Sequence, residues 1–167
     1  LIEVPPPLAA DAPAAVTASG ETRRLGAPIP ASLPASPRVL VLDIETQRSA
    51  EEVGGWDKAD RMGLAVAVTQ DLTSGEVRVY TEDQVGALCA ELTAAALIIG
   101  FNIRRFDFSV LRGYRDLDYA ALPTLDILEE VHAALGFRLS LSHLAQETLG
   151  APKLADGLQS LAWWKAG

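Results

Sequence analysis

Residues 38–45, "RVLVLDIE", decide the fold because they read as a buried β-strand that ends in two acids. Residues two apart on a strand face the same way, so Asp43 and Glu45 project together near its carboxyl end. At about 5 Å and an effective dielectric near 20, two carboxylates repel by roughly 3 kcal/mol. A divalent cation such as Mg²⁺ or Mn²⁺ reverses that cost. In the alternative reading, Glu45 has left the strand and is solvated, and Asp43 caps a turn.

The segments that follow predict a hairpin, a helix and a further strand. Residues 62–70 and 76–80 read as two strands joined by a turn that contains Ser74 and Gly75. The segment after Glu82 has helical spacing of its apolar residues, and Cys89 is one of its core positions. Residues 95–102 form another apolar run of strand length.

The C-terminal half is mostly helical in pattern. We expect helices over 105–114, 124–136 and 140–150, and a last one that starts near Asp156. Thr124 and Ser140 are the expected N-caps of the second and third, and a glycine ends each. The residues expected on the inner faces are Ile127, Leu128, Val131, Leu135, Leu141, Leu144, Ala145 and Leu149. The order β-β-β-α-β-α followed by helices indicates an α/β fold with a mixed sheet.

Residues 1–37 differ in composition from the rest of the chain. They hold eight of the ten prolines and no aromatic residue, a composition typical of a linker. Such a segment buries too little apolar surface to offset the entropy lost when a chain becomes ordered. We therefore expect one domain over 38–167. The chain begins with Leu1 rather than Met, so we expect it to be a piece of a longer protein.

The charge balance limits the possible partners. Fourteen Lys and Arg stand against 22 Asp and Glu, for a net charge of -8, which disfavours non-specific nucleic-acid binding and confines any such role to a local site. The single cysteine and the absence of zinc-type spacing suggest a reducing, cytoplasmic setting. The sequence contains no apolar run of membrane-span length and no signal-peptide pattern, so we expect no membrane association.

A third acid follows the strand at 95–102. In "IIGFNIRRFDFSVL", residues 98–111, the strand ends at Asn102 and Asp107 opens a helix. Structurally, Asp107 reads as a helix-start acid that the helix dipole favours. The same geometry would bring its carboxylate to the carboxyl edge of the sheet beside Asp43 and Glu45. Three acids at that edge suggest a metal site.

Four segments together resemble the successive motifs of the DEDD superfamily of 3′-to-5′ exonucleases, which have a ribonuclease-H-like fold: "LDIET", "FNIRRFD", "LPTLDIL" and "LSLSHLAQETLG". The likeness covers residues 38–167. It is closest to the exonuclease domains of bacterial ribonuclease-H-like proteins, some of which are attached to helicases, and it implies a role in DNA repair. It implies that Asp43, Glu45 and Asp107 are catalytic and bind Mg²⁺ or Mn²⁺. The implied reaction is two-metal hydrolysis of the terminal phosphodiester of DNA or RNA, at single-stranded 3′ ends.

The sequence departs from that family at its last motif. The family has a fourth carboxylate, an Asp with Tyr four residues or His five residues before it. Asp156 is the only acid after Glu147, and Pro152 and Ala151 occupy those two positions, so we read Asp156 as a helix N-cap. We expect the fourth motif to lie beyond Gly167. The isolated chain should then bind the metal weakly and hydrolyse strand ends poorly or not at all.

Substrate contacts are assigned to residues beside the acids: Thr46, Asn102, Arg104, Arg105 and Trp56. The paired arginines could reach a phosphate, and Trp56, on a flexible loop over 46–61, could stack on a terminal base. The alternatives are a solvated arginine face and a packed tryptophan.

Other polar and aromatic residues have structural interpretations. We expect His132 and His143 on helix surfaces and Trp163 and Trp164 in a core or interface. Asp126 should stabilise a helix start, with a supporting role at the site as its second interpretation.

Two other functions compete with the exonuclease. Aspartyl-nucleophile phosphatases also begin with a strand ending in two acids, but they need Asp at both positions and Glu45 departs from that. The non-enzymatic alternative is a silent nucleic-acid-binding or interaction module of a larger helicase-like protein. A Tyr-x-x-x-Asp or His-x-x-x-x-Asp motif following in the parent sequence would favour the enzyme.

Overall fold

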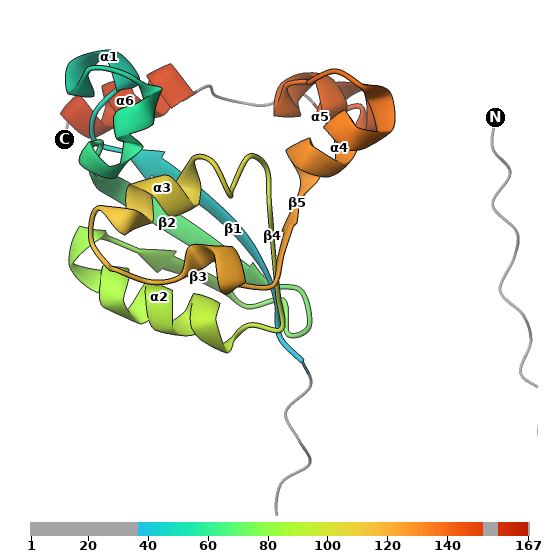
Figure 1. Cartoon of the computed structure of the whole chain (residues 1–167), viewed down its shortest axis with the longest axis horizontal. Coiled ribbons are helices and arrows are strands. Elements are labelled where there is room, and N and C mark those ends of the chain that lie inside the picture. The colour runs from blue at the N-terminus through green and yellow to red at the C-terminus, as the bar shows by residue number, and fades with distance from the viewer. Residues whose placement is uncertain (1–36, 152–156, 167) are drawn as a thin grey trace, which may run out of the picture. The chain divides into compact units, whose positions relative to one another are not determined.

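A five-stranded mixed sheet is the centre of the computed structural model, which describes residues 37–151 and 157–166 (Figure 1). The strands lie in the order β3-β2-β1-β4-β5, and β1 is antiparallel to β2 but parallel to β4. β3 is antiparallel to β2, and β5 is parallel to β4. The strands are β1 (Val39–Thr46), β2 (Leu64–Asp71), β3 (Val77–Tyr80), β4 (Leu97–Gly100) and β5 (Thr124–Asp126).

Helices alternate with strands along most of the chain, apart from the hairpin of β2 and β3. The α-helices are α1 (Ala50–Val53), α2 (Val85–Ala94), α3 (Asp107–Arg112), α4 (Ile127–Leu135), α5 (Leu141–Leu149) and α6 (Gly157–Ala166). Short 3₁₀ helices are η1 (Trp56–Arg61), η2 (Glu82–Gln84) and η3 (Tyr119–Ala121). None of the helices in the described ranges is long and apolar enough to cross a bilayer.

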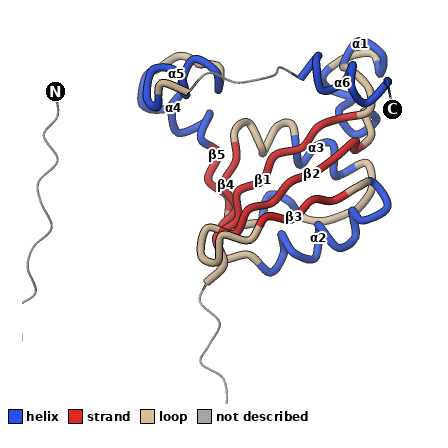
Figure 2. Tube along the Cα trace, turned by 180° about the vertical axis from the view of Figure 1, so that it is seen from behind, coloured by secondary structure: helices blue, strands red, loops and turns tan. Residues whose placement is uncertain are grey.

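The core forms between one face of the sheet and the helices α2 and α3. In β1, Leu40, Leu42 and Ile44 are buried and alternate with residues that face the other way. They share a core with Leu88 of α2 and Phe108 of α3. Figure 2 shows the sheet from its other side, with the strands nearest the viewer. That face is more open.

The open face is partly apolar. Val68, Val77 and Val79 lie on it and are 36%, 57% and 60% exposed. Because strand residues alternate between faces, Asp43 and Glu45 belong to this face and not to the core. The alternation removes the conflict of placing two acids in a core strand.

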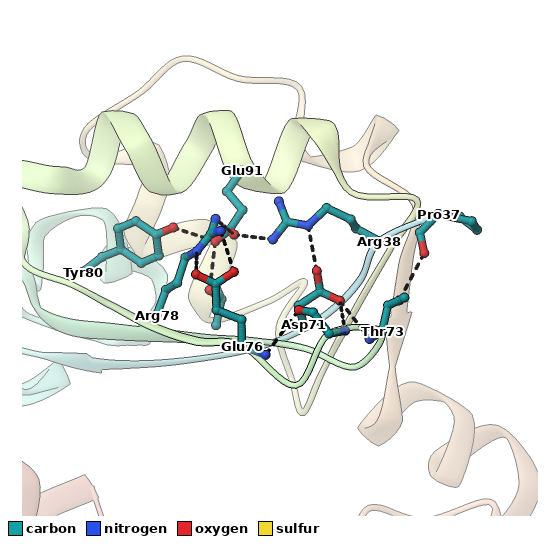
Figure 3. A network of polar contacts seen from close by, with 10 residues as sticks. Pro37, Arg38, Asp71, Thr73, Glu76, Arg78, Tyr80 and Glu91 are labelled. Carbon is teal, nitrogen blue, oxygen red and sulfur yellow. Dashed lines mark hydrogen bonds and ion pairs between the residues drawn. The ribbon is translucent and has the colours of Figure 1, made fainter. Parts of the chain in front are cut away.

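The polar network in Figure 3 fastens α2 to the sheet. The carboxylate of Glu91, with a side chain only 4% exposed, accepts hydrogen bonds from Arg38 and Arg78, each at 2.6 Å. Thr69 and Tyr80 donate to its second oxygen at 2.8 and 2.7 Å. These partners belong to, or directly precede, the first three strands, so one helix side chain joins all three strands.

Several expectations about local structure are confirmed. The hairpin of β2 and β3 turns through Gly75, which has a φ of 77°. Ser140 caps α5 by accepting from the backbone N–H of His143, and Gly150 ends it in the left-handed conformation. Cys89 is buried in α2.

The expected helix start at Thr124 is wrong. Residues 124–126 form β5, because Thr124 and Asp126 pair with Ile98 and Gly100 of β4. Asp126 is the N-cap of α4 in place of Thr124, and its side chain accepts from the Leu128 N–H. A strand of three residues is too short to show an alternating pattern.

The expected inner faces of α4 and α5 are also largely wrong. In α4 only Leu128 is buried, and Leu135 is 50% exposed. No residue of α5 is buried within the described part of the chain, and Leu149 is 78% exposed. Helical periodicity defines an apolar face but carries no information about what covers it.

The segment 46–61 is structured, so the expectation of a flexible loop is wrong. Ser49 and Glu52 form a capping box at the start of α1, and η1 follows directly. The end of α3 packs tightly on η1, because a Cβ added at Gly113 would overlap the carbonyl oxygen of Asp60. The linker expected over residues 1–37 falls almost entirely on residues 1–36, and these lie outside the described ranges, as does the Asp156 cap.

Candidate functional site

The three predicted acids line one cavity of about 460 Å³. Asp43 and Glu45 reach it from the carboxyl end of β1, and Asp107 is the first residue of α3. β1 and β4 run parallel, so their carboxyl ends meet at the same edge of the sheet and the loop after β4 leads into α3 there. Thr46, Trp56 and Asn102 line the same cavity, whose apolar walls include Met62, Phe101, Phe106, Leu128 and Leu141.

Asp107 is the most buried of the three acids, with 4% of its surface exposed. Burial raises the pKa of its carboxyl well above the usual value, and the charges of Asp43 and Asp126 raise it further. Hydrogen bonding to backbone N–H groups, including that of Ile44, acts against this increase. A cation beside Asp107 would act against both effects, because it favours the charged form of the carboxyl.

The residue types fit a hard divalent cation, since carboxylate oxygens are the ligands that Mg²⁺ and Mn²⁺ prefer. The charge distribution fits as well, because Asp43 lies close enough to Asp107 to raise its pKa. Over the described ranges, no three His, Cys, Asp or Glu side chains are grouped closely enough to form a finished metal site. The three carboxylates therefore suit a divalent cation in their chemistry and charge. Their oxygens would have to move closer to one another when the cation binds.

Asp126 supports the loop that precedes Asp107. It is 2% exposed, and its carboxylate accepts from the backbone N–H groups of Asn102 at 2.8 Å and Arg104 at 3.1 Å. Asn102 has a φ of 62°, which is uncommon for a residue other than glycine. The cap of α4 and the loop after β4 thus share one acid, so both interpretations of Asp126 are compatible with the structure.

The predicted substrate residues lie around a second cavity of about 670 Å³. Trp56, Asn102, Arg104 and Arg105 all line it, whereas Thr46 lines the acidic cavity. The Trp56 ring meets the Phe106 ring edge-on, with centroids 5.9 Å apart at 64°. Arg104 is already engaged, because it donates to the Thr124 carbonyl and lies 3.4 Å from Glu129.

Two cavity residues were not expected from the sequence. Arg112, at the end of α3, and Arg138, between α4 and α5, line the second cavity. Arg112 could have been found from the expected helix over 105–114, because it lies seven residues after Arg105 and so on the same helix face. Arg138 had no sequence signal, since only the fold brings it to Asn102, whose side-chain oxygen accepts from it at 3.1 Å.

The remaining predicted residues lie outside the acidic cavity. His132 and His143 are exposed, as expected for helix-surface residues. His132 lines a further small cavity with Arg105 and Arg138. Trp163 and Trp164 of α6 are 59% and 47% exposed, so neither is a core residue in the described structure.

Comparison with known proteins gives matches among solved structures alone. No protein-family model and no curated protein sequence matches the chain. A family B DNA polymerase from the hyperthermophilic archaeon Pyrobaculum calidifontis matches with a TM-score of 0.58 and 14% identity, over 80% of this chain and 22% of the polymerase. The zinc-ion-bound complex of E. coli ExoI with single-stranded DNA gives a TM-score of 0.49 and 16% identity, over 77% of this chain and 40% of ExoI. The chain thus spans less than half of each protein, and the first likeness, together with the strand order, shows an α/β fold of the ribonuclease-H-like type.

Proposed function

We propose that this chain is a nuclease domain that removes nucleotides from the 3′ end of a DNA or RNA strand. Asp43, Glu45 and Asp107 would hold Mg²⁺ or Mn²⁺. The supporting observation is that these three carboxylates, predicted from two motifs about 60 residues apart, line one cavity at the carboxyl edge of the sheet. When bound, the cations would make a water more acidic and would offset the charge of the leaving oxygen.

The chain's own residues would prepare the site for a strand end. Asp107 lies in a buried environment, where charges interact more strongly than in water. Apolar side chains such as Met62 and Leu128 line the same cavity. Asp126 fixes the loop that carries Asn102 and Arg104, so the wall beside the acids is set before a strand arrives.

The test of this proposal is end-directed cleavage by the purified 167-residue chain. With Mn²⁺ and a single-stranded oligonucleotide labelled at its 5′ end, we expect slow, stepwise shortening. A 3′ label should appear first as a mononucleotide. Asp43→Asn should abolish cleavage, because it removes one cation ligand. Equal cleavage by wild type and Asp43→Asn would contradict the proposal.

Metal binding has a readout that needs no cleavage. A cation that binds the folded state alone stabilises it, by about 2.7 kcal/mol at 100 times its Kd. We expect Mn²⁺ to raise the Tm of the wild type but not of Asp107→Asn. Asp118→Asn, which changes an exposed acid at the N-cap of η3, is the matched control and should keep the rise.

A second candidate function is a nucleic-acid-binding module without catalysis, in a longer protein that includes a helicase. It is favoured by the finding that, in the described part of the chain, no three acids are grouped as a finished metal site. Strand binding in EDTA with no Mn²⁺-dependent shortening at any metal concentration would select this candidate.

A further inference from the structure

The second cavity, which we call the arginine pocket, shares a wall with the acidic cavity. Trp56, Asn102 and Phe106 line both. The rest of its lining includes one acid, Asp57, and the four arginines Arg104, Arg105, Arg112 and Arg138. A positively charged cavity therefore continues directly from the negatively charged one.

Three of the four arginines in the arginine pocket form no ion pair with any described residue. Arg105 is exposed, and its side chain makes no hydrogen bond or ion pair with any described residue. Arg112 lies over the ring of Tyr119, 5.6 Å from its centroid, and Arg138 donates to the neutral amide of Asn102. Of the four, Arg104 alone forms an ion pair with a described residue, at 3.4 Å from Glu129.

This concentration of cations is unusual in a chain of net charge -8. Such a chain repels a polyanion at long range, so a phosphate is tolerated only where local charge is reversed. Guanidinium groups suit that role, since their planar fork donates to two phosphate oxygens at once. The chemistry of the pocket points to repeated phosphates, not to an isolated carboxylate.

An aromatic side chain stands at the boundary of the two cavities. Trp56 is 73% exposed, although its ring packs edge-on against Phe106. A tryptophan face beside arginines is what an unpaired base stacks on. Bases in a duplex are already stacked and paired, so this combination favours a single strand.

The wall that carries the arginines is held in place before any ligand binds. The buried carboxylate of Asp126 accepts from the backbone N–H groups of Asn102 and Arg104, which fixes the loop next to Arg105. A preformed site loses less entropy when a ligand binds than a flexible one does.

We propose that the arginine pocket holds the phosphodiester backbone of a single-stranded nucleic acid, and that Trp56 stacks on the base between this pocket and the acidic cavity. The proposal rests on the proposed function, which places the strand end at the acids. Backbone binding itself uses charge and stacking, so it requires no metal. This separates the two proposals experimentally.

The test measures binding of a fluorescent oligothymidine to the whole chain in EDTA, over a series of salt concentrations. We expect wild type to bind, with a log–log salt slope that Arg105→Glu reduces by about 0.7, the value for one phosphate contact on a single strand. Arg115→Glu makes the same charge change at an exposed arginine outside both cavities and should leave the slope unchanged. Trp56→Ala should weaken binding roughly 5- to 150-fold through lost stacking.

Heparin and a duplex of matched charge serve as comparison ligands. We expect oligothymidine to bind more tightly than either, and Trp56→Ala to remove most of that preference. No binding in EDTA, an equal effect of Arg105→Glu and Arg115→Glu, or equal affinity for heparin would overturn the arginine pocket as a single-strand site. If binding follows these expectations but Mn²⁺ produces no cleavage, only the nuclease proposal fails.

Discussion

Asp126 connects two backbone segments, the loop after β4 and the start of α4, through three hydrogen bonds. Its carboxylate accepts from Asn102 and Arg104 after β4 and from Leu128 at the start of α4. Asp126 is only 2% exposed. If its carboxylate were removed, these three backbone donors would be left without a partner in a place that water does not easily reach. A single side chain thus links the stability of the loop to the shape of the candidate site.

Changing Asp126 to Asn should therefore destabilise the chain. One carboxylate oxygen becomes an NH₂ group that faces a backbone N–H donor, and we expect a loss of about 1.5–3 kcal/mol in the free energy of unfolding. Urea denaturation measures it. Asp118→Asn is the control, since Asp118 also accepts two backbone N–H groups but is exposed. Equal small losses in both variants would contradict this role for Asp126.

At this scale, the sequence was informative where a residue type conflicts with its local pattern. Asp43 and Glu45 stand out because acids are rare at the end of an aliphatic strand, and Asp107 because it opens a helix after the next parallel strand. Arg138 could not be predicted in the same way. It lies on a connection whose position depends on the tertiary packing of α4, and no local pattern marks it.

At the scale of elements, the attachment of α2 to the sheet depends on Glu91. Its removal would leave the buried hydroxyl groups of Thr69 and Tyr80 without an acceptor, at about 1–3 kcal/mol each, or about 2–6 kcal/mol together. We expect Glu91→Ala to lower the free energy of unfolding by that amount in urea denaturation. Glu76→Ala is the matched control, because Glu76 also pairs with Arg78 but is 52% exposed.

The control should cost no more than about 1 kcal/mol, the usual range for a surface pair. Comparable losses in the two variants would show that burial does not set the strength of this network. Binding of oligothymidine should survive in both, since Arg38 precedes the start of β1 and the acids lie near its other end.

The prediction of helices and strands succeeded where the local sequence signal is strong. It failed where tertiary packing decides which element forms or which face is covered. The hairpin of β2 and β3 and the caps of α5 follow from turn and cap residues within a few positions. β5 was missed because its three residues become a strand only through pairing with β4. The apolar faces of α4 and α5 were real patterns, but the described structure leaves most of them uncovered.

At the scale of the whole molecule, the Glu91 network makes part of the stability depend on pH. Burial alone would raise the pKa of Glu91, but hydrogen bonds from Tyr80, Arg38 and Thr69 lower it below its usual value. A carboxyl whose pKa is lowered by folding stabilises the folded state above its unfolded pKa of about 4.3, and loses that effect as the pH falls through the folded value.

The difference in unfolding free energy between wild type and Glu91→Gln isolates this contribution. We expect the difference to stay constant from about pH 7 to pH 5 and to shrink below about pH 4. Urea midpoints measured across that range provide the check. A difference that stays constant down to pH 3, roughly one unit below the unfolded pKa, would argue that the charge of Glu91 is not what stabilises α2.

The tight contact of Gly113 with Asp60 bears on how quickly a ligand could enter. This contact fixes η1, and with it the backbone of Trp56, against α3. The backbone at the boundary of the acidic cavity and the arginine pocket is therefore held in place before any strand arrives. Association would then be limited by diffusion and orientation, near the ordinary rate of about 10⁵–10⁷ M⁻¹s⁻¹, and not by a slower rearrangement of the protein.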